Sequence, residues 1–203
     1  MTLDPFYPIV PDAAWASRLV PLGVKLLQLR IKDAPPETVR REIAETMRLC
    51  ASHDCQLVVN DYWCEAIELG AGFVHLGQED LAAADLGAIK QAGLKLGISS
   101  HSLEELAAAK AAEPDYVALG PVYETKLKVM PWAPQGLARV KAWRAALHCP
   151  LVAIGGITLE RAPAVLEAGA DSASVITDVV TSENPEQRTK DWISATQRWR
   201  EIH

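Results

Sequence analysis

The stretch LVAIGGITLERAPAVLEAGADSASVI, residues 151–176, contains the unit from which the fold is predicted. Its short apolar run Leu151–Ile154 predicts a buried strand. A segment with helical spacing, Leu159–Ala168, comes next and is followed by Gly169, where a helix is expected to stop. The apolar run Ser172–Ile176 then completes a strand–helix–strand unit, which indicates parallel strands covered by helices.

The same alternation of strand and helix repeats along the chain. Eight such units in 203 residues predict an α/β fold of the (β/α)₈ (TIM) barrel type, in one domain over residues 1–203. An open doubly wound sheet is the alternative, but no Gly-x-Gly-x-x-Gly motif follows the first strand to support a dinucleotide fold. The expected strands are Tyr7–Val10, Val24–Arg30, Gln56–Asn60, Phe73–Leu76, Lys95–Ser99, Tyr116–Leu119, Leu151–Ile154 and Ser172–Ile176. The expected helices are Ala13–Val20, Glu37–Ala51, Trp63–Leu69, Ala83–Gln91, Leu103–Ala112, Gly136–Ala146, Leu159–Ala168 and a last one from Pro185 onward.

Composition limits the class of protein. Apolar residues make up 49% of the chain and charged residues 23%, which is typical of a globular protein. The apolar runs are too short to cross a bilayer and the start lacks the features of a signal peptide, so no membrane association is expected. A net charge of −6 argues against nucleic-acid binding but is compatible with a local cationic pocket. The cysteines show no paired zinc spacing, which indicates reduced thiols in a cytoplasmic protein. The oligomeric state is left open, a homo-oligomer included.

Two cations and an amide lie at the end of the second predicted strand. In an extended strand Gln28, Arg30 and Lys32 share one face. Such groups are costly to bury unless an anion or a wet cavity offsets their desolvation. The alternative is a strand that emerges into solvent and bears ordinary surface charges. In a (β/α)₈ barrel the active site is built at these carboxyl ends of the strands, which favours an anion site.

Two carboxylates follow neighbouring strands. Asp61 and Asp80 are expected to converge at the barrel mouth, where they would suit Mg²⁺ that takes its other ligands from water and phosphate. The alternative is that each aspartate caps the helix that follows it. His75, flanked by apolar residues, is expected to be a hydrogen-bonded core histidine, and Asp12 to be a helix cap.

Glycines and small polar residues end the last two strands. Gly155–Gly156 and Ile176–Thr177 occupy the places where many barrels bind phosphate through backbone N–H groups. A tight turn is the alternative explanation of the glycines. The long connection Gly120–Gln135 contains Lys126 and Lys128 and is expected to be functional, as a loop that covers the mouth.

Eight segments, in order from about Tyr7 to Val180, resemble thiamine phosphate synthase. This family is a (β/α)₈ barrel that joins hydroxymethylpyrimidine pyrophosphate to a thiazole phosphate, or its carboxylated form, and gives thiamine phosphate and pyrophosphate. The matching segments are QLRIK (28–32), VND (59–61), HLGQED (75–80), GISSH (97–101), GPVYET (120–125), APQGL (133–137), AIGGI (153–157) and GAD (169–171).

The resemblance implies a role for each matching residue. In this family the bond to pyrophosphate breaks first, and the thiazole nitrogen captures the resulting pyrimidine cation, so metal and cations matter more than acid–base groups. Implied substrate-binding residues are Gln28, Arg30, Lys32, Asn60, Ser99, Thr125, Lys128, Gly156, Ile176 and Thr177. Of these, Arg30, Lys32, Lys128 and Ser99 are implied to take part in catalysis, and Asp61 and Asp80 are the implied Mg²⁺ ligands.

One position departs from the family pattern. The loop commonly has Thr-x-Thr-Lys, whereas here it has Leu127 at the second threonine position. The thiazole phosphate is therefore expected to lose one contact or to gain one from Lys126, which would change its affinity and not the reaction. Two alternatives remain. A thiazole tautomerase would use a histidine at His101 but would leave the pyrophosphate and metal groups unexplained. A non-catalytic phosphate-binding barrel would bind ligand without turnover.

Overall fold

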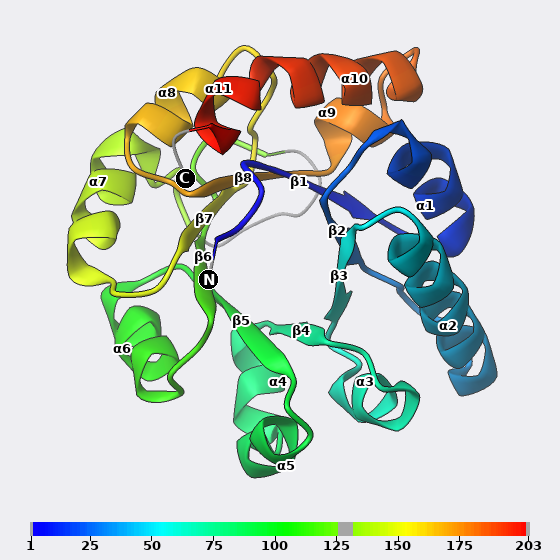
Figure 1. The fold of residues 1–203 in the computed structure, drawn as a ribbon. Helices are drawn as coiled ribbons and strands as arrows, with labels where there is room; N and C mark the ends of the chain where they lie inside the picture. The colour runs from blue at the N-terminus through cyan, green and yellow to red at the C-terminus, as the bar shows by residue number, and fades with distance from the viewer. Residues whose placement is uncertain (1, 126–131, 202–203) are drawn as a thin grey trace.

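Eight parallel strands close into a barrel surrounded by helices (Figure 1). The computed structural model describes residues 2–125 and 132–201. Each strand pairs with the next along the chain and β8 pairs with β1, so the predicted (β/α)₈ barrel is confirmed. The strands are β1 (Phe6–Val10), β2 (Leu26–Leu29), β3 (Gln56–Asn60), β4 (Phe73–Leu76), β5 (Lys95–Ser100), β6 (Tyr116–Leu119), β7 (Leu151–Ile154) and β8 (Ser172–Val175). The helices are α1 (Ala13–Leu19), the 3-10 turn η1 (Val20–Leu22), α2 (Pro36–Ser52), α3 (Trp63–Leu69), α4 (Gln78–Ala83), α5 (Leu86–Gln91), α6 (Leu103–Ala111), α7 (Gly136–Ala146), α8 (Ala162–Glu167), α9 (Thr177–Val180), α10 (Pro185–Ala195) and α11 (Gln197–Arg200).

Several boundaries differ from the predicted ones for local reasons. Strand β2 is shorter than Val24–Arg30, because Val24 is buried but lies before the strand pairing begins. The predicted helix Ala83–Gln91 corresponds to α5, which begins only at Leu86 because Asp85 is its cap and accepts a 2.9 Å hydrogen bond from the Ala88 N–H. The helix before it, α4, was not predicted. Helix α8 begins only at its Ala162, later than expected, and the short α9 was not predicted.

The C-terminal helix is also divided. The segment from Pro185 onward was expected to be one helix, but α10 ends at Ala195 and α11 begins at Gln197. Between them the buried hydroxyl of Thr196 donates to the Trp192 carbonyl at 2.7 Å, which offers the backbone a local partner at the break. At the other end of the chain Asp12 caps α1 as predicted, because its carboxylate accepts from the Trp15 N–H at 2.8 Å.

The inside of the barrel is filled by alternate residues of each strand. Tyr7, Leu26, Val58, Phe73 and Tyr116 belong to this inner cluster, while the residues between them face the helices. The Tyr116 ring fits because its neighbour on β5 is Gly97. A Cβ at Gly97 would overlap the Tyr116 ring and lie 2.6 Å from its hydroxyl oxygen. The glycine therefore makes room for a large interior side chain.

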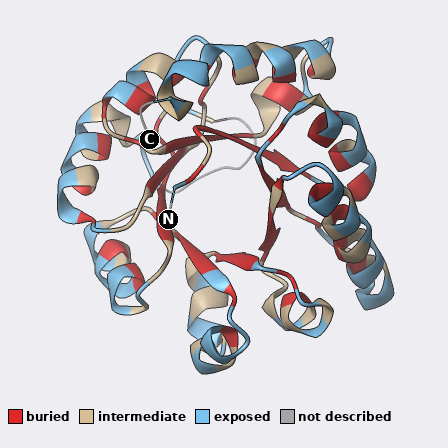
Figure 2. Cartoon of the chain, viewed as in Figure 1, coloured by how far each residue is buried: buried red, intermediate tan, exposed pale blue. Residues whose placement is uncertain are grey.

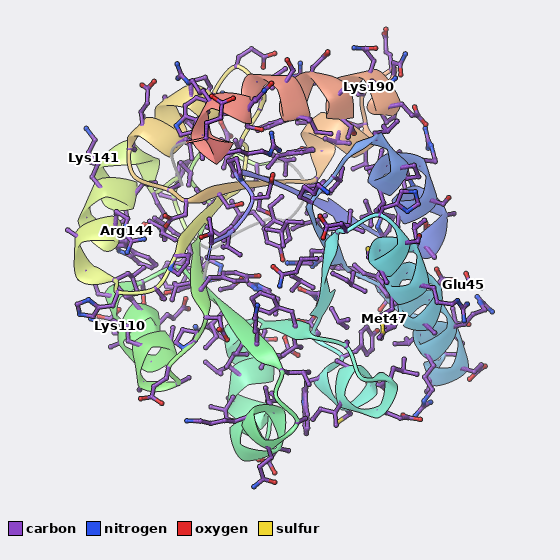
Figure 3. All side chains as sticks on the ribbon, in the orientation of Figure 1. Glu45, Met47, Lys110, Lys141, Arg144 and Lys190 are labelled. Atoms are coloured by element: carbon purple, nitrogen blue, oxygen red, sulfur yellow. The ribbon has the colours of Figure 1, made fainter. Side chains whose placement is uncertain are left out.

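The outer face of the barrel is covered by amphipathic helices. Figure 2 shows buried strands at the centre and exposed outer helix faces. Phe6 of β1 stacks on Trp192 of α10 with ring centroids 5.1 Å apart, which fixes the last long helix on the barrel. Side chains such as Lys141 on α7 point outward (Figure 3). Across residues 2–125 and 132–201, no helix has the length and apolar character needed to span a bilayer.

Candidate active site

The carboxyl ends of all eight strands open on one side of the barrel, and polar groups gather there. Gln28 and Asn60 are buried at the ends of β2 and β3 with only 3% and 5% of their surface exposed. Ser99 is half-buried near the end of β5. Strand alternation turns the three side chains into the barrel. Three of the ten residues expected to bind substrate are thus brought together at the base of the mouth.

The two cations of QLRIK are placed differently from one another. Strand β2 ends at Leu29, so Arg30 and Lys32 follow the strand and do not belong to it. The Arg30 N–H still donates to the Val10 carbonyl at 2.8 Å, which keeps the half-buried arginine in line with the sheet. Lys32 is exposed. The expectation of three residues on one strand face is therefore corrected, since only Gln28 lies in the strand itself.

A chain of hydrogen bonds crosses the barrel interior beneath the mouth. The Gln28 amide nitrogen lies 2.9 Å from the Tyr7 hydroxyl, which lies 3.1 Å from the Tyr116 hydroxyl. Tyr116 is 2.7 Å from Nδ1 of His75, and Nε2 of His75 is 2.8 Å from the Ser99 hydroxyl. His75 is therefore the hydrogen-bonded core histidine that was predicted. The two tyrosines were missed, because their hydroxyls meet across strands that are far apart in sequence.

The ionisable side chains of this hydrogen-bonded chain, His75 and the two tyrosines, are kept neutral by burial. Burial is the main reason that the pKa of His75 falls to about 3, and the nearby Arg30 charge lowers it further. The pKa values of Tyr7 and Tyr116 are raised, mainly by burial. At neutral pH the imidazole therefore has one N–H and one acceptor nitrogen, each beside a hydroxyl group.

Asp61 and Asp80 form a carboxylate pair at the rim. The pKa of Asp61 is raised from its ordinary 3.8 to about 6, first by burial, then by the charge of Asp80 and a hydrogen bond with it. The Arg30 charge opposes this increase. The convergence expected from the sequence is therefore observed.

Neither aspartate is a helix cap, so the alternative explanation is wrong. The cap position of α3 is Tyr62, and Asp61 precedes it with a left-handed backbone, φ 66°. The Asp61 N–H donates to the His75 carbonyl at 2.9 Å, which ties this turn to β4. Asp80 lies in the first turn of α4, whose cap position is Gly77. Both carboxylates are thus left available at the mouth.

The glycines after β7 lie against the loop that leaves β6. The Tyr123 N–H donates to the Gly155 carbonyl at 3.0 Å, which joins the two segments. Gly156 has φ 63°, and a Cβ there would overlap the Glu124 carbonyl oxygen. The glycine is required by this close approach as well as by the turn. Thr125, the residue after Glu124 in this loop, is half-buried. Lys126, Leu127 and Lys128 lie outside the described residues.

The rim after β8 is held by Asp178, whose side chain is only 8% exposed and whose role the sequence did not reveal. Ile176 and Thr177 are half-buried at the start of α9. Beside them Asp178 accepts hydrogen bonds from Arg188 at 2.9 Å and from the Trp192 indole at 2.6 Å. Asp178 also accepts from a backbone N–H of the β7–α8 loop at 3.3 Å. These contacts join α9, α10 and the loop after β7, and so keep Thr177 on the same side of the mouth as Gly156.

A groove of about 390 Å³ lies beside the mouth between the loops that follow β5 and β6. His101 and Trp132 stack there with ring centroids 6.2 Å apart. The His101 side chain is also 2.8 Å from the Glu105 carboxylate, and the Gln135 amide donates to the His101 carbonyl at 2.9 Å. Through these contacts His101 joins the loop after β5 to the loop after β6.

The geometry defines a (β/α)₈ barrel enzyme whose mouth combines a carboxylate pair, an adjacent arginine and glycine-rich strand ends, a set suited to phosphorylated substrates. The family model described as thiamine monophosphate synthase matches residues 7–179. This chain therefore belongs to the thiamine monophosphate synthase family, and the resemblance inferred from the motifs is confirmed.

Individual relatives agree with the family match. The chain is 60% identical over 203 residues to a thiamine-phosphate synthase of Rhizobium etli, which covers 100% of both chains. It is 47% identical over 191 residues to a thiamine-phosphate synthase of Serratia proteamaculans, covering 94% of this chain and 87% of the relative. The solved structure of a thiamine phosphate pyrophosphorylase from Pyrococcus furiosus superposes with a TM-score of 0.85 at 27% identity, covering 97% and 96% of the two chains.

Proposed function

We propose that the barrel mouth is the active site of a transferase that joins hydroxymethylpyrimidine pyrophosphate to a thiazole phosphate. The products are thiamine phosphate and pyrophosphate. The observation that supports this most strongly is the Asp61–Asp80 pair beside Arg30, because it lies at the catalytic end of a barrel whose sequence matches this family. A diphosphate is the substrate group that calls for both cations and a metal at one place.

We assign the pyrimidine pyrophosphate to the side of the mouth formed by β2, β3 and β5. Gln28, Asn60 and Ser99 present buried or half-buried polar groups that can bind a heteroaromatic ring. Arg30 and Lys32 lie above them, where cations would bind the diphosphate. The half-buried arginine is in the better position to act on charge that develops in a water-poor site, while Lys32 meets the diphosphate from the solvent side.

We assign Mg²⁺ to Asp61 and Asp80. The donor set fits, because two carboxylate groups plus water and diphosphate oxygens complete the octahedron that this ion prefers. In the described ranges, 2–125 and 132–201, no group of three or more His, Cys, Asp or Glu side chains could hold a metal ion. We therefore expect the metal to bind together with the diphosphate. Bound Mg²⁺ would neutralise the leaving pyrophosphate.

We assign the thiazole phosphate to the opposite rim. The loop after β7, with Gly156, and the start of α9, with Ile176 and Thr177, are joined through Asp178. Their backbone N–H groups and the Thr177 hydroxyl are the proposed phosphate donors. Thr125 approaches from the β6–α7 loop. Lys128, which lies outside the described residues, is assigned to the same loop by the sequence pattern alone.

The proposed reaction needs little proton transfer. The bond between the pyrimidine methylene carbon and the pyrophosphate oxygen breaks, and its electron pair leaves with pyrophosphate. The thiazole nitrogen then donates its lone pair to the methylene carbon. The role of this chain is to hold both substrates in line, to stabilise the leaving charge with Arg30, Lys32 and Lys128, and to exclude water. The free thiols of the four cysteines are compatible with the cytoplasmic location that we propose.

Pyrophosphate release by the purified protein tests the proposal. We expect release only when both substrates and Mg²⁺ are present, with thiamine phosphate formed in equal amount. Release from the pyrimidine substrate alone would indicate a hydrolase. No release, together with binding of the thiazole phosphate, would refute the synthase and favour the tautomerase or a non-catalytic barrel. Conversion of a non-aromatic thiazole tautomer would then separate those two.

A further inference from the structure

The hydrogen-bonded chain from Gln28 to Ser99 links five strands through the barrel interior. Its members belong to β2, β1, β6, β4 and β5 in that order, and the four distances between them run from 2.7 to 3.1 Å. The middle three, Tyr7, Tyr116 and His75, lie below the mouth and have 6% or less of their surface exposed. Apolar side chains would fill the same volume at lower desolvation cost, so the polar chain calls for an explanation beyond packing.

The direction of the protons along this chain follows from its first member. The nitrogen of the Gln28 amide faces Tyr7, and an amide nitrogen can only donate. The Tyr7 oxygen accepts this bond, and because the amide nitrogen cannot also accept the Tyr7 proton, we infer that this proton is donated to the Tyr116 oxygen 3.1 Å away. The Tyr116 proton is in turn directed to Nδ1 of His75. A neutral imidazole that accepts at Nδ1 has its proton at Nε2, and this proton is donated to Ser99.

Ser99 is the end of the chain, and its own proton is left to point elsewhere. Its hydroxyl oxygen accepts from His75, while its backbone carbonyl accepts from the Gln78 amide at 2.6 Å. Ser99 is half-buried and so reaches the mouth, unlike the other hydroxyls of the chain. The O–H that it presents there is a hydrogen-bond donor, and its partner must be an acceptor.

We propose that Tyr7, Tyr116 and His75 are positioning residues that fix the Ser99 hydroxyl as a donor to a ring nitrogen of the pyrimidine substrate. This inference rests on the proposed function for the identity of the ring. Without the hydrogen bond from His75, the Ser99 hydroxyl could rotate and either donate a hydrogen bond to the substrate or accept one from it. Here the order of the chain removes that choice before the substrate arrives, which lowers the entropic cost of binding.

The tautomer of His75 tests the proton order without any substrate. In ¹⁵N-labelled protein the two imidazole nitrogens give distinct NMR shifts, and the His75 signals are assigned by their loss in His75→Gln. We expect the Nε2–H tautomer. The Nδ1–H tautomer would overturn the proposal, because the chain would then run the other way and Ser99 would donate inward to His75.

Kinetics of Tyr116→Phe test the consequence for the substrate. Loss of this hydroxyl interrupts the chain between Tyr7 and His75, so we expect KM for the pyrimidine pyrophosphate to rise about tenfold with KM for the thiazole phosphate unchanged. The matched control is Thr46→Val, which removes a buried hydroxyl bonded to the Glu42 carbonyl at 2.8 Å in α2. The control should lose stability and leave both KM values unaltered.

The outcomes separate this inference from the proposed function. Equal changes in both KM values, or none, would show a purely structural chain and overturn the positioning role. If Tyr116→Phe fails to fold, Tyr7→Phe tests the same step one bond further from Ser99. If the wild-type protein shows the Nε2–H tautomer but releases no pyrophosphate, the function is refuted and with it the pyrimidine as the partner of Ser99, while the proton order stands.

Discussion

Replacement of Gly156 by alanine should act on the thiazole side of the mouth through the neighbouring loop. Gly156 has φ 63°, and a Cβ there would overlap the Glu124 carbonyl oxygen and lie 2.9 Å from Cβ of Tyr123. Both atoms belong to the segment that leads into Thr125. The control is Gly93→Ala in the turn before β5, because Gly93 has φ 73° but nothing within 4 Å of the Cβ position.

Both variants bear the cost of a left-handed backbone at alanine, but only Gly156→Ala also bears a steric overlap. A left-handed backbone costs an alanine about 1–2 kcal/mol relative to the right-handed region, and this applies to Gly156 and Gly93 alike. The overlap adds about 1–3 kcal/mol at Gly156 alone, since backbone must move to relieve it. We therefore expect Gly156→Ala to lower the free energy of unfolding by about 2–5 kcal/mol and Gly93→Ala by about 1–2 kcal/mol.

Urea unfolding and steady-state kinetics measure the two effects. Displacement of the β6–α7 loop should raise KM for the thiazole phosphate at least tenfold in Gly156→Ala, with a smaller change for the pyrimidine pyrophosphate. Gly93→Ala should retain wild-type KM values. The reasoning is refuted if the two variants are equally stable and Gly156→Ala binds the thiazole phosphate normally, because the loop would then tolerate the added carbon.

Other predictions concern the charged groups of the mouth. Since folding raises the pKa of Asp61 to about 6, its contribution to stability is present below pH 3.8 and lost as pH rises through 6. Asp61→Asn without Mg²⁺ should therefore unfold at higher urea concentration than the wild type at pH 8 but not at pH 4, and no difference at pH 8 would contradict this. Asp80→Asn should abolish Mg²⁺-dependent turnover, whereas Glu79→Gln, an equal loss of charge in the same turn, should keep it; a shared loss would argue for a general charge effect. Lys32→Ala should raise KM for the pyrimidine pyrophosphate about tenfold, with Lys141→Ala on α7 as the control; a change in KM for the thiazole phosphate alone would reverse the two substrate assignments.

The barrel could be predicted because its strands alternate regularly with helices. Gln56–Asn60 and Tyr116–Leu119 have the predicted bounds, since in both the buried run and the paired run coincide. At β2 the two runs do not coincide, because Val24 is buried but lies before the strand begins at Leu26. An apolar pattern indicates burial and not strand pairing, so it predicted a strand that is too long. Helix α4 was missed for the opposite reason. It contains no fully buried residue, so its six residues have no apolar stripe to reveal it.

The site could be predicted only as far as strand ends show it. Asp61 and Asp80 follow adjacent strands, and their convergence needs nothing beyond the order of the strands. The contact between Tyr7 and Tyr116 depends instead on two interior side chains that meet across the barrel, 109 residues apart. The sequence hints at this contact only through Gly97, the neighbour of Tyr116 on β5. A glycine inside a strand has several explanations, so it does not predict the contact.

Among the described acidic residues with a left-handed backbone, Asp61 differs from the others in bearing two separate costs. Asp33, Asp54 and Glu113 also have left-handed backbones, but all three are exposed, so their cost is confined to the backbone. At Asp61 the same backbone strain coincides with burial beside Asp80, whose charge opposes the ionisation of Asp61 and raises its pKa. A divalent cation together with a diphosphate would relieve the second cost and leave the first unchanged. This relief of repulsion is the physical reason for proposing the metal at this pair in preference to an exposed acidic turn.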